Sequence, residues 1–150
     1  MTNNKLDAAL AYAAQGWRVH PLRPGTKLPM IKWKDAATTD EQTIHQWWTQ
    51  TPSANIGIAT GSDSVIVLDV DIKGNKRGDD SLAELFKQNG AINTLMAATP
   101  SGGFHLYMLA NPNHTYSNAV DFAEGLDFRA DNGYIVAPPS QIGGASYEWV

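Results

Sequence analysis

The segment Val65-Ile-Val-Leu-Asp-Val-Asp-Ile72 limits the possible folds more than any other part of the chain. It consists of β-branched and aliphatic residues interrupted only by two aspartates, a composition typical of a strand. Because side chains alternate between the two faces of a strand, Asp69 and Asp71 should share one face, while their apolar neighbours occupy the other. The chain therefore has to build a sheet with a hydrophobic core on one face and two carboxylates on the opposite face.

The remaining segments alternate between helical and extended patterns. Apolar spacing predicts helices over 5–15, 38–50 and 79–89, and a capping box of Thr38 and Glu41 should start the second helix. Residues 110–122 read as a loop. This mixture of helices with hairpins late in the chain favours an α+β fold around a mostly antiparallel sheet. Further strands are predicted at 17–22, 55–61, 64–72, 95–99, 104–109, 126–129 and 134–137.

The size and composition exclude several classes of protein. The 150 residues match one domain, and the strand-like segment 147–150 leads us to expect a fragment of a longer protein. Cysteine is absent, which excludes a disulfide framework, a thiolate zinc site and a cysteine nucleophile. There is no apolar run of about 20 residues and no secretory signal, so we expect a cytoplasmic protein without a membrane partner. The net charge of −4 leaves nucleic-acid binding to a local site.

The two aspartates predict a metal site. On one face of a strand their Cα atoms should lie about 6.6 Å apart, which lets both carboxylates reach one pair of divalent cations. Carboxylate oxygens suit Mg²⁺ or Mn²⁺. The alternative is a strand that simply runs out into a solvated turn at 73–75. The nearby Lys73, Lys76 and Arg77 could hold phosphates, or they could be the tip of an exposed loop.

A glycine turn precedes a histidine in the segment Pro100-Ser-Gly-Gly-Phe-His105. Gly102 and Gly103 could point successive backbone N–H groups into one anion-binding concavity, beside the Ser101 hydroxyl. Alternation places His105 on the side of Gly103, so the turn and the imidazole could together bind a triphosphate. The alternative is an ordinary hairpin turn followed by a partly buried histidine. The other histidines, His20, His45 and His114, lack such surroundings and read as structural or surface residues.

A third acidic residue follows in Leu126-Asp-Phe-Arg129. Alternation puts Asp127 and Arg129 on one face, where Asp127 could complete the carboxylate set of a two-metal phosphoryl-transfer site. Arg129 could pair with Asp127 or contact a phosphate. The alternative is a surface ion pair. Asp121, Glu124 and Asp131 compete for the role of third acid, although Asp131 lies in an Asp-Asn-Gly sequence typical of a tight turn.

In this order and spacing, the motifs resemble the bifunctional DNA primase/polymerase (Prim-Pol) N-terminal domain of the archaeo-eukaryotic primase superfamily. That superfamily shows an Asp-x-Asp motif, a small-residue turn ending in His, and a third acid after an apolar residue. The resemblance extends from about residue 8 to residue 149. It also includes Pro24-Gly-Thr-Lys-Leu-Pro29 with Trp33, Asn55-Ile-Gly-Ile-Ala-Thr-Gly61, and the block from Asp127 to Ser140.

The resemblance implies an RRM-like sheet carrying the acids, packed with an N-terminal α/β unit. It implies template-directed nucleotidyl transfer from nucleoside triphosphates to a primer 3′-hydroxyl, on primer–template or single-stranded DNA. In this scheme Asp69, Asp71 and Asp127 hold two divalent cations, and His105, Ser101, Gly102 and Gly103 bind the triphosphate. Arg129 and Lys27 are further phosphate contacts, and Trp33 is either a stacking surface or a core residue.

The chain differs from some members of this family, and two other functions are consistent with its motifs. Without cysteine, the zinc-binding element of some relatives is not expected, and priming and extension need not both be retained. Relatives often carry a helicase further along the chain and serve plasmid or phage replication. A non-catalytic module that binds nucleotides or single-stranded DNA would bind without releasing pyrophosphate. A two-metal nuclease would shorten DNA instead, and it would leave the glycine turn without a role.

Overall fold

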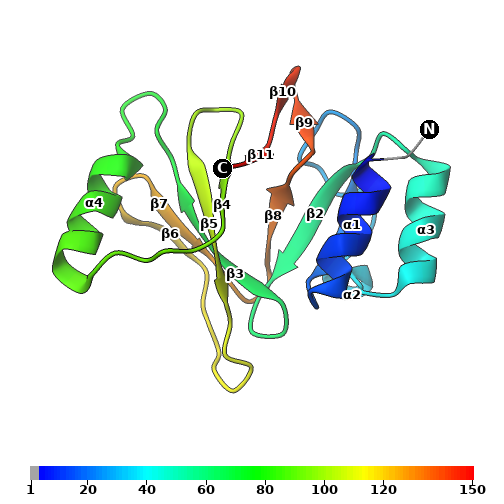
Figure 1. Ribbon diagram of the computed structural model, residues 1–150, viewed down its shortest axis with the longest axis horizontal. Helices are drawn as coiled ribbons and strands as arrows, with labels where there is room; N and C mark the ends of the chain where they lie inside the picture. Colours follow the sequence, from blue (N-terminus) through cyan, green and yellow to red (C-terminus); the bar gives the residue numbers. More distant parts are fainter. Residues whose placement is uncertain (1–3) are drawn as a thin grey trace.

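A computed structural model describes residues 4–150 (Figure 1). The helices are α1 (Asn4–Ala14), α2 (Trp33–Ala36), α3 (Glu41–Gln50) and α4 (Gly78–Asn89). The strands are β1 (Arg18–Leu22), β2 (Asn55–Thr60), β3 (Val65–Val70), β4 (Met96–Ala98), β5 (Phe104–Leu109), β6 (Ala119–Ala123), β7 (Leu126–Arg129), β8 (Gly133–Ala137), β9 (Gln141–Ile142), β10 (Ala145–Ser146) and β11 (Glu148–Trp149).

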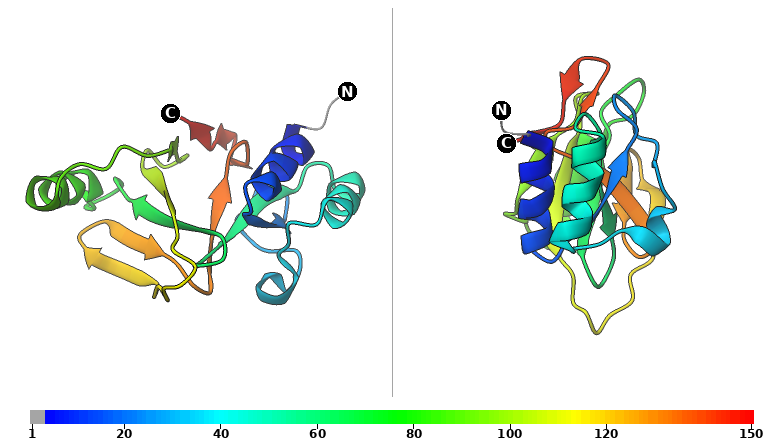
Figure 2. Two further views of the ribbon diagram at one scale, coloured as in Figure 1. Left: turned by 60° about the horizontal axis from the view of Figure 1, so that its bottom comes forward. Right: turned by 90° about the vertical axis from the view of Figure 1, so that its right-hand side faces the viewer.

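The sheet consists of two parts that curl away from each other (Figures 1 and 2). The N-terminal unit contains β1, β2 and β8, with α1 and α3 packed on it. The acidic unit has the strand order β6-β7-β3-β5-β4-β11, with α4 beside it. Thr60 and Val65 form the one register pair between β2 and β3, and this pair is parallel. All other strand pairs within residues 4–150 are antiparallel. The predicted α+β fold with a mostly antiparallel sheet is confirmed.

Strand β3 is buried on both faces over most of its length. Leu68 and Val70 lie in the core beneath α4, as alternation predicts. Val65 and Val67 are buried as well, because they face the core shared with the N-terminal unit. Only Asp69 on this strand is more than slightly exposed. The face of β3 that carries Asp69 is therefore mostly buried and reaches solvent only at Asp69, whereas the sequence predicted that this face would carry two carboxylates.

Three local predictions need correction, and two elements were missed. The N-cap of α3 is Asp40, whose carboxylate accepts a hydrogen bond from the Thr43 N–H at 2.9 Å, whereas Thr38 forms a β-bridge with Val19. Strand β3 ends at Val70, so alternation along the strand does not extend to Asp71. The segment predicted to be loop contains β6, whose register with β7 shifts around Asp121, a residue with φ +48°. Helix α2 and the β9–β10 hairpin were not predicted.

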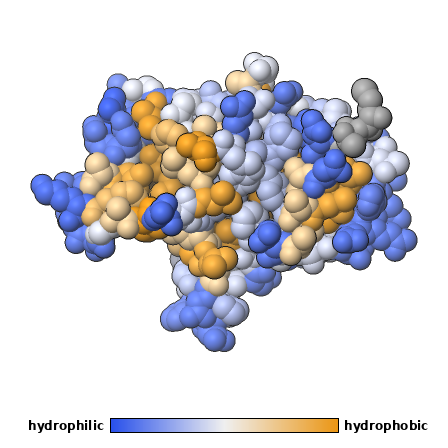
Figure 3. Space-filling view, viewed as in Figure 1, coloured by the Kyte–Doolittle hydropathy of each residue, from blue (hydrophilic) through white to orange (hydrophobic). Residues whose placement is uncertain are grey.

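Hydrophobic side chains gather on one side of the acidic unit. In the view of Figure 3 they extend over α4 and the strands next to it. Leu85, Phe86, Met96 and Met108 are partly buried residues of this region that pack on the core below. Among residues 4–150, none of the helices has both the length and the apolar composition needed to cross a bilayer.

Candidate active site

Register pairing brings three of the predicted residues into one row. Asp69 on β3 lies directly opposite His105 on β5 and directly opposite Asp127 on β7. Side chains of directly opposed residues project from the same face with Cβ atoms about 4.5–5.5 Å apart. Two of the three predicted acids are therefore neighbours because of pairing between segments almost 60 residues apart in the sequence, with His105 on the other side of Asp69.

Each acid of the row has its own positively polarised partner. The His105 Nε2 atom is 3.4 Å from Asp69 Oδ1. Asp127 Oδ1 accepts a hydrogen bond from the Asp121 backbone N–H at 2.7 Å, and Asp127 Oδ2 lies 3.1 Å from an Arg129 nitrogen. These partners offset the repulsion that two directly opposed carboxylates would otherwise produce.

The pKa of Asp69 is lowered in spite of its burial. Burial by itself raises the pKa, because it disfavours the charged form. The hydrogen bond and charge of His105, followed by the charges of Arg129 and Lys27, outweigh this effect and lower the pKa below its usual value. Asp69 is consequently held as a carboxylate at neutral pH.

Asp71 follows the strand and is held through its backbone. Its N–H donates to the Gly125 carbonyl at 2.7 Å, and its own carbonyl accepts from the Gly78 N–H at 2.8 Å. Both glycines are required by close approach, since a Cβ at Gly78 would lie 2.5 Å from Gly125 O and 2.6 Å from Asp71 O. The Asp71 carboxylate lies 3.8 Å from the Lys76 Nζ atom, which is 3.5 Å from Asp121.

The predicted metal ligands fit divalent cations by their chemistry. Asp69, Asp71 and Asp127 supply hard oxygen donors, and two of the three lie side by side in register. Within residues 4–150, no three His, Asp or Glu side chains are arranged around one point as metal ligands. Each of the three predicted carboxylates instead contacts a basic side chain, that of His105, Lys76 or Arg129. The three-carboxylate ligand set stays a prediction.

The glycine turn is tightly closed. The Gly102 N–H donates to the Thr99 carbonyl at 3.0 Å, and the Gly103 N–H donates to the Thr99 hydroxyl at 3.1 Å. A Cβ at Gly103 would lie 2.2 Å from the Val70 carbonyl oxygen, so a side chain is excluded there. Both amides predicted to bind phosphate are thus engaged within the turn, and their anion role stays a prediction that requires these two bonds to open. Ser101 lines a hollow of about 270 Å³ together with Lys27 and Lys73.

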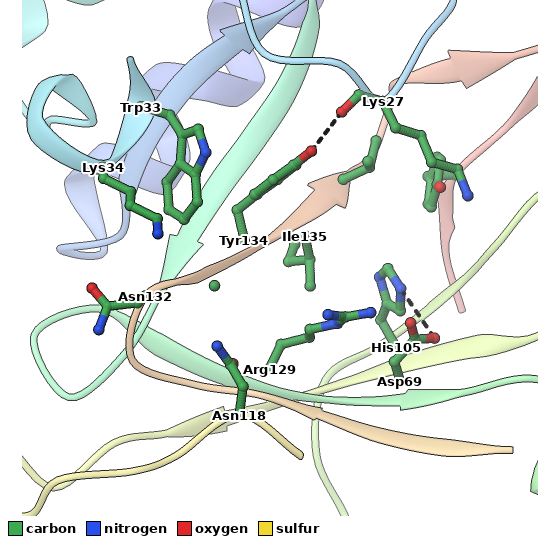
Figure 4. Close-up of a pocket in the computed structure, with 13 residues that line it drawn as sticks. Lys27, Trp33, Lys34, Asp69, His105, Asn118, Arg129, Asn132, Tyr134 and Ile135 are labelled. Atoms are coloured by element: carbon green, nitrogen blue, oxygen red, sulfur yellow. Dashed lines mark hydrogen bonds and ion pairs between the residues drawn. The ribbon is translucent and has the colours of Figure 1, made fainter. Parts of the chain in front are cut away.

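A larger pocket of about 390 Å³ lies between the two parts of the sheet (Figure 4). Asp69, His105 and Arg129 line it from the acidic unit, as the sequence predicts for a shared site. Lys27 and Tyr147 line both this pocket and the Ser101 hollow, so the two spaces adjoin. Residues not predicted from the sequence complete the wall: Lys34, Asn118, Asn132, Gly133, Tyr134, Ile135, Val136 and Tyr147.

Sequence reasoning could have found some of these residues and not others. Tyr134 lies in a predicted strand that the resemblance already included, so its position was available. Asn118 and Lys34 lie in segments without a recognisable periodicity. His105, which was predicted to belong to the site, lies in the row. His20, which was predicted to be structural or at the surface, is fully buried behind Trp33, with ring centroids 5.4 Å apart. His45 and His114 are exposed, as expected.

The fold is that of an α+β protein with a mostly antiparallel sheet, in which two opposed carboxylates lie beside a pocket lined by Lys27, Lys34 and Arg129. A comparison with protein families identifies the group. The chain matches the model of the bifunctional DNA primase/polymerase N-terminal domain over residues 9–150, and it belongs to this family. Membership implies DNA primase or polymerase activity of the nucleotidyltransferase type, with binding of nucleotides and DNA. A comparison with curated proteins finds no match.

Proposed function

We propose that this domain joins nucleoside triphosphates to a primer 3′-hydroxyl under the direction of a DNA template, with release of pyrophosphate. The observation that carries the proposal is the register row in which Asp69 lies between Asp127 and His105. The row borders a pocket with three cationic side chains, those of Lys27, Lys34 and Arg129. Carboxylates that could bind metal cations thus lie next to lysine and arginine side chains that could bind phosphates, an arrangement that phosphoryl transfer requires.

Asp69, Asp71 and Asp127 would hold two divalent cations, Mg²⁺ or Mn²⁺. When bound, the cations supply Lewis-acid stabilisation of charge on the attacking hydroxyl and on the transferred phosphate. The lowered pKa of Asp69 keeps it ionised and ready to act as a ligand. The side chains of Lys76 and Arg129 are partly exposed and can move away from Asp71 and Asp127. Bound cations would then replace them as the positive partners of these largely buried carboxylates.

The remaining residues would bind the nucleotide. His105 holds Asp69 through Nε2, and it is the side chain of β5 that borders the pocket beside that carboxylate. Arg129 and Lys27 bring positive charge to the same space. Ser101 and Lys73 line the adjoining hollow, which would take the phosphates furthest from the reaction.

Primer extension tests the proposal directly. A labelled primer–template is incubated with the four dNTPs and Mg²⁺ or Mn²⁺, and wild type is compared with Asp69→Asn, which keeps the shape of the side chain and removes its charge. We expect wild type to lengthen the primer and the variant to be slower by at least about a hundredfold, the rate equivalent of a loss of about 3 kcal/mol. The matched control is Asp80→Asn, an exposed aspartate of α4 that should leave extension unchanged.

The same assay separates the other candidate functions. A primer that becomes shorter would indicate a two-metal nuclease. Binding of nucleotides or single-stranded DNA without extension would indicate a non-catalytic module. Equal extension by wild type and Asp69→Asn would refute the assignment of the row as the reaction centre.

A further inference from the structure

We propose that the end of the pocket formed by Trp33, Lys34 and Tyr134 binds a nucleobase together with its phosphate, the base stacking on Trp33 and the phosphate pairing with Lys34. This inference rests on the proposed function and names the part of the substrate that the distal end of the site receives. Figure 4 shows Trp33 and Lys34 at one end of the pocket, with Asp69 and His105 at the other and Arg129 between them.

Trp33 is held in place from behind rather than buried. The ring of His20 stacks on it with centroids 5.4 Å apart and planes inclined by 22°. The Tyr134 ring packs edge-on against Trp33, with the two ring centroids 4.9 Å apart. The Trp33 side chain nevertheless remains partly exposed and lines the pocket. A tryptophan needed only for the core would be expected to bury its ring, whereas one supported by His20 and otherwise covered only by the flexible Lys34 side chain can stack on a base.

The support beneath Trp33 is itself built into the sheet. His20 is fully buried and pairs in register with Gly57 on the neighbouring strand. A Cβ at Gly57 would lie 2.4 Å from the His20 Cε1 atom, so only glycine leaves room for the imidazole across the strand. The Tyr134 hydroxyl donates to the Lys27 carbonyl at 2.8 Å, which ties the loop before α2 to β8. The stacking surface is therefore fixed before any ligand binds.

The charge around this end fits a phosphate. The pocket is lined by three cationic side chains and by one carboxylate, that of Asp69, although the whole chain has a net charge of −4. The Lys34 Nζ atom lies over the Trp33 ring, 5.8 Å from its centre. Because the Lys34 side chain is exposed, the ammonium can move aside when a base stacks on the ring and can then pair with the phosphate of the same nucleotide. The Asn132 side chain, which makes no hydrogen bond in the described part of the chain, lines the same end. The Trp33 ring could stack on the base, the Lys34 ammonium could pair with the phosphate, and the Asn132 amide could hydrogen-bond to the sugar or to the edge of the base.

Binding measurements without added metal test the inference independently of catalysis. A fluorescein-labelled oligo(dT) twelve-mer is titrated by anisotropy, and dATP is measured by isothermal titration calorimetry. Trp33→Ala should weaken binding by at least about fivefold, the lower limit for loss of one stacked base, whereas Trp33→Phe should stay within about twofold of wild type. If Trp33→Ala fails to fold, the comparison of Trp33→Phe with Trp33→Leu replaces it.

The lysines provide a matched pair. Lys34→Ala should reduce the slope of log affinity against log salt concentration by about 0.7, the contribution of one phosphate contact on a single strand. Lys32 is two residues from Lys34, and its side chain is exposed and does not line the pocket. Lys32→Ala therefore removes the same charge outside the pocket and should leave the slope unchanged. An effect confined to the oligonucleotide would assign the subsite to a DNA strand, and an effect confined to dATP would assign it to the incoming nucleotide.

The outcomes separate this inference from the proposed function. It is overturned if wild type binds neither probe, if folded Trp33 variants lacking the aromatic ring bind both probes as wild type does, or if Lys32→Ala and Lys34→Ala have equal effects. Primer extension by wild type together with unchanged binding by these Trp33 variants would reject the subsite and retain the enzyme. Ring-dependent binding without extension would retain the subsite and reject the enzyme.

Discussion

Replacing the buried His20 with phenylalanine should change how the stability of the protein depends on pH. Burial lowers the pKa of His20 from 6.5 to about 4, with a smaller opposing effect of the Pro21 backbone. Between these two values the unfolded chain binds a proton that the folded chain does not bind. Stability therefore falls as the pH is lowered from about 7 towards 4, and His20 makes no such contribution above pH 7.

The size of the effect follows from the two pKa values. Going from pH 8 to pH 5, the proton on the unfolded chain lowers the free energy of unfolding by about 2 kcal/mol. For a chain of this size, that corresponds to a decrease in melting temperature of about 4–8 °C. Phenylalanine has a similar planar ring and cannot titrate, so His20→Phe should lack this part of the decrease.

Urea denaturation of wild type and His20→Phe at half-unit steps from pH 5 to pH 8 measures the effect. The two free-energy curves should run parallel above pH 7, and His20→Phe should gain about 2 kcal/mol relative to wild type by pH 5. Ile58→Val is the control, because it changes a buried side chain that cannot titrate, and its curve should stay parallel to wild type. Parallel curves for wild type and His20→Phe throughout would refute the reasoning.

Two further substitutions and one double-mutant cycle test contacts that stabilise the fold. Gly78→Ala places a Cβ against two backbone carbonyls at 2.5 and 2.6 Å, and it should lower the free energy of unfolding by about 1–3 kcal/mol in urea denaturation, whereas exposed Asp80→Ala should change it by less than about 0.5. Ser140→Ala leaves the buried Ile56 N–H without its partner at 2.8 Å and should cost about 1–3 kcal/mol; an equal loss from Ser146→Ala would contradict this. The exposed Arg18–Asp63 pair should contribute less than about 1 kcal/mol in a double-mutant cycle, and a larger coupling energy would show that the pair is more shielded than its exposure indicates.

Local patterns predicted the elements whose residues alternate or recur regularly. Strands β5 and β7 have the bounds expected from their sequence, and Asp69 faces the pocket as the alternation predicts. Helix α2 escaped prediction because its four residues are too few to show a helical period. Strand β6 escaped because Asp121 has a positive φ, which interrupts alternation at its centre.

The composition of the pocket is harder to predict for a different reason. Trp33, Arg129 and Tyr147 line one pocket because the two parts of the sheet diverge and leave a space between them, and no pattern within one segment specifies that divergence. Motif order pointed to Asp69, Asp127 and His105, which register pairing places opposite one another, whereas Asp71 lies beyond the end of β3. The aromatic and cationic end depends on packing between segments more than 90 residues apart, and it emerges only from the folded chain.

The single register pair that joins the two parts of the sheet has a mechanical consequence. Beside Thr60 and Val65, the Asp131 carboxylate accepts hydrogen bonds from the Ser62 and Tyr116 backbone N–H groups, at 2.8 and 3.1 Å. The core cluster that contains Ile58, Val67 and Tyr107 also joins the two parts. The spacing between Trp33 on one wall and Asp69 on the other is therefore set by the junction and by this shared core together. The aperture of the site can accordingly be adjusted by substitutions at the junction, by residues that never touch a substrate.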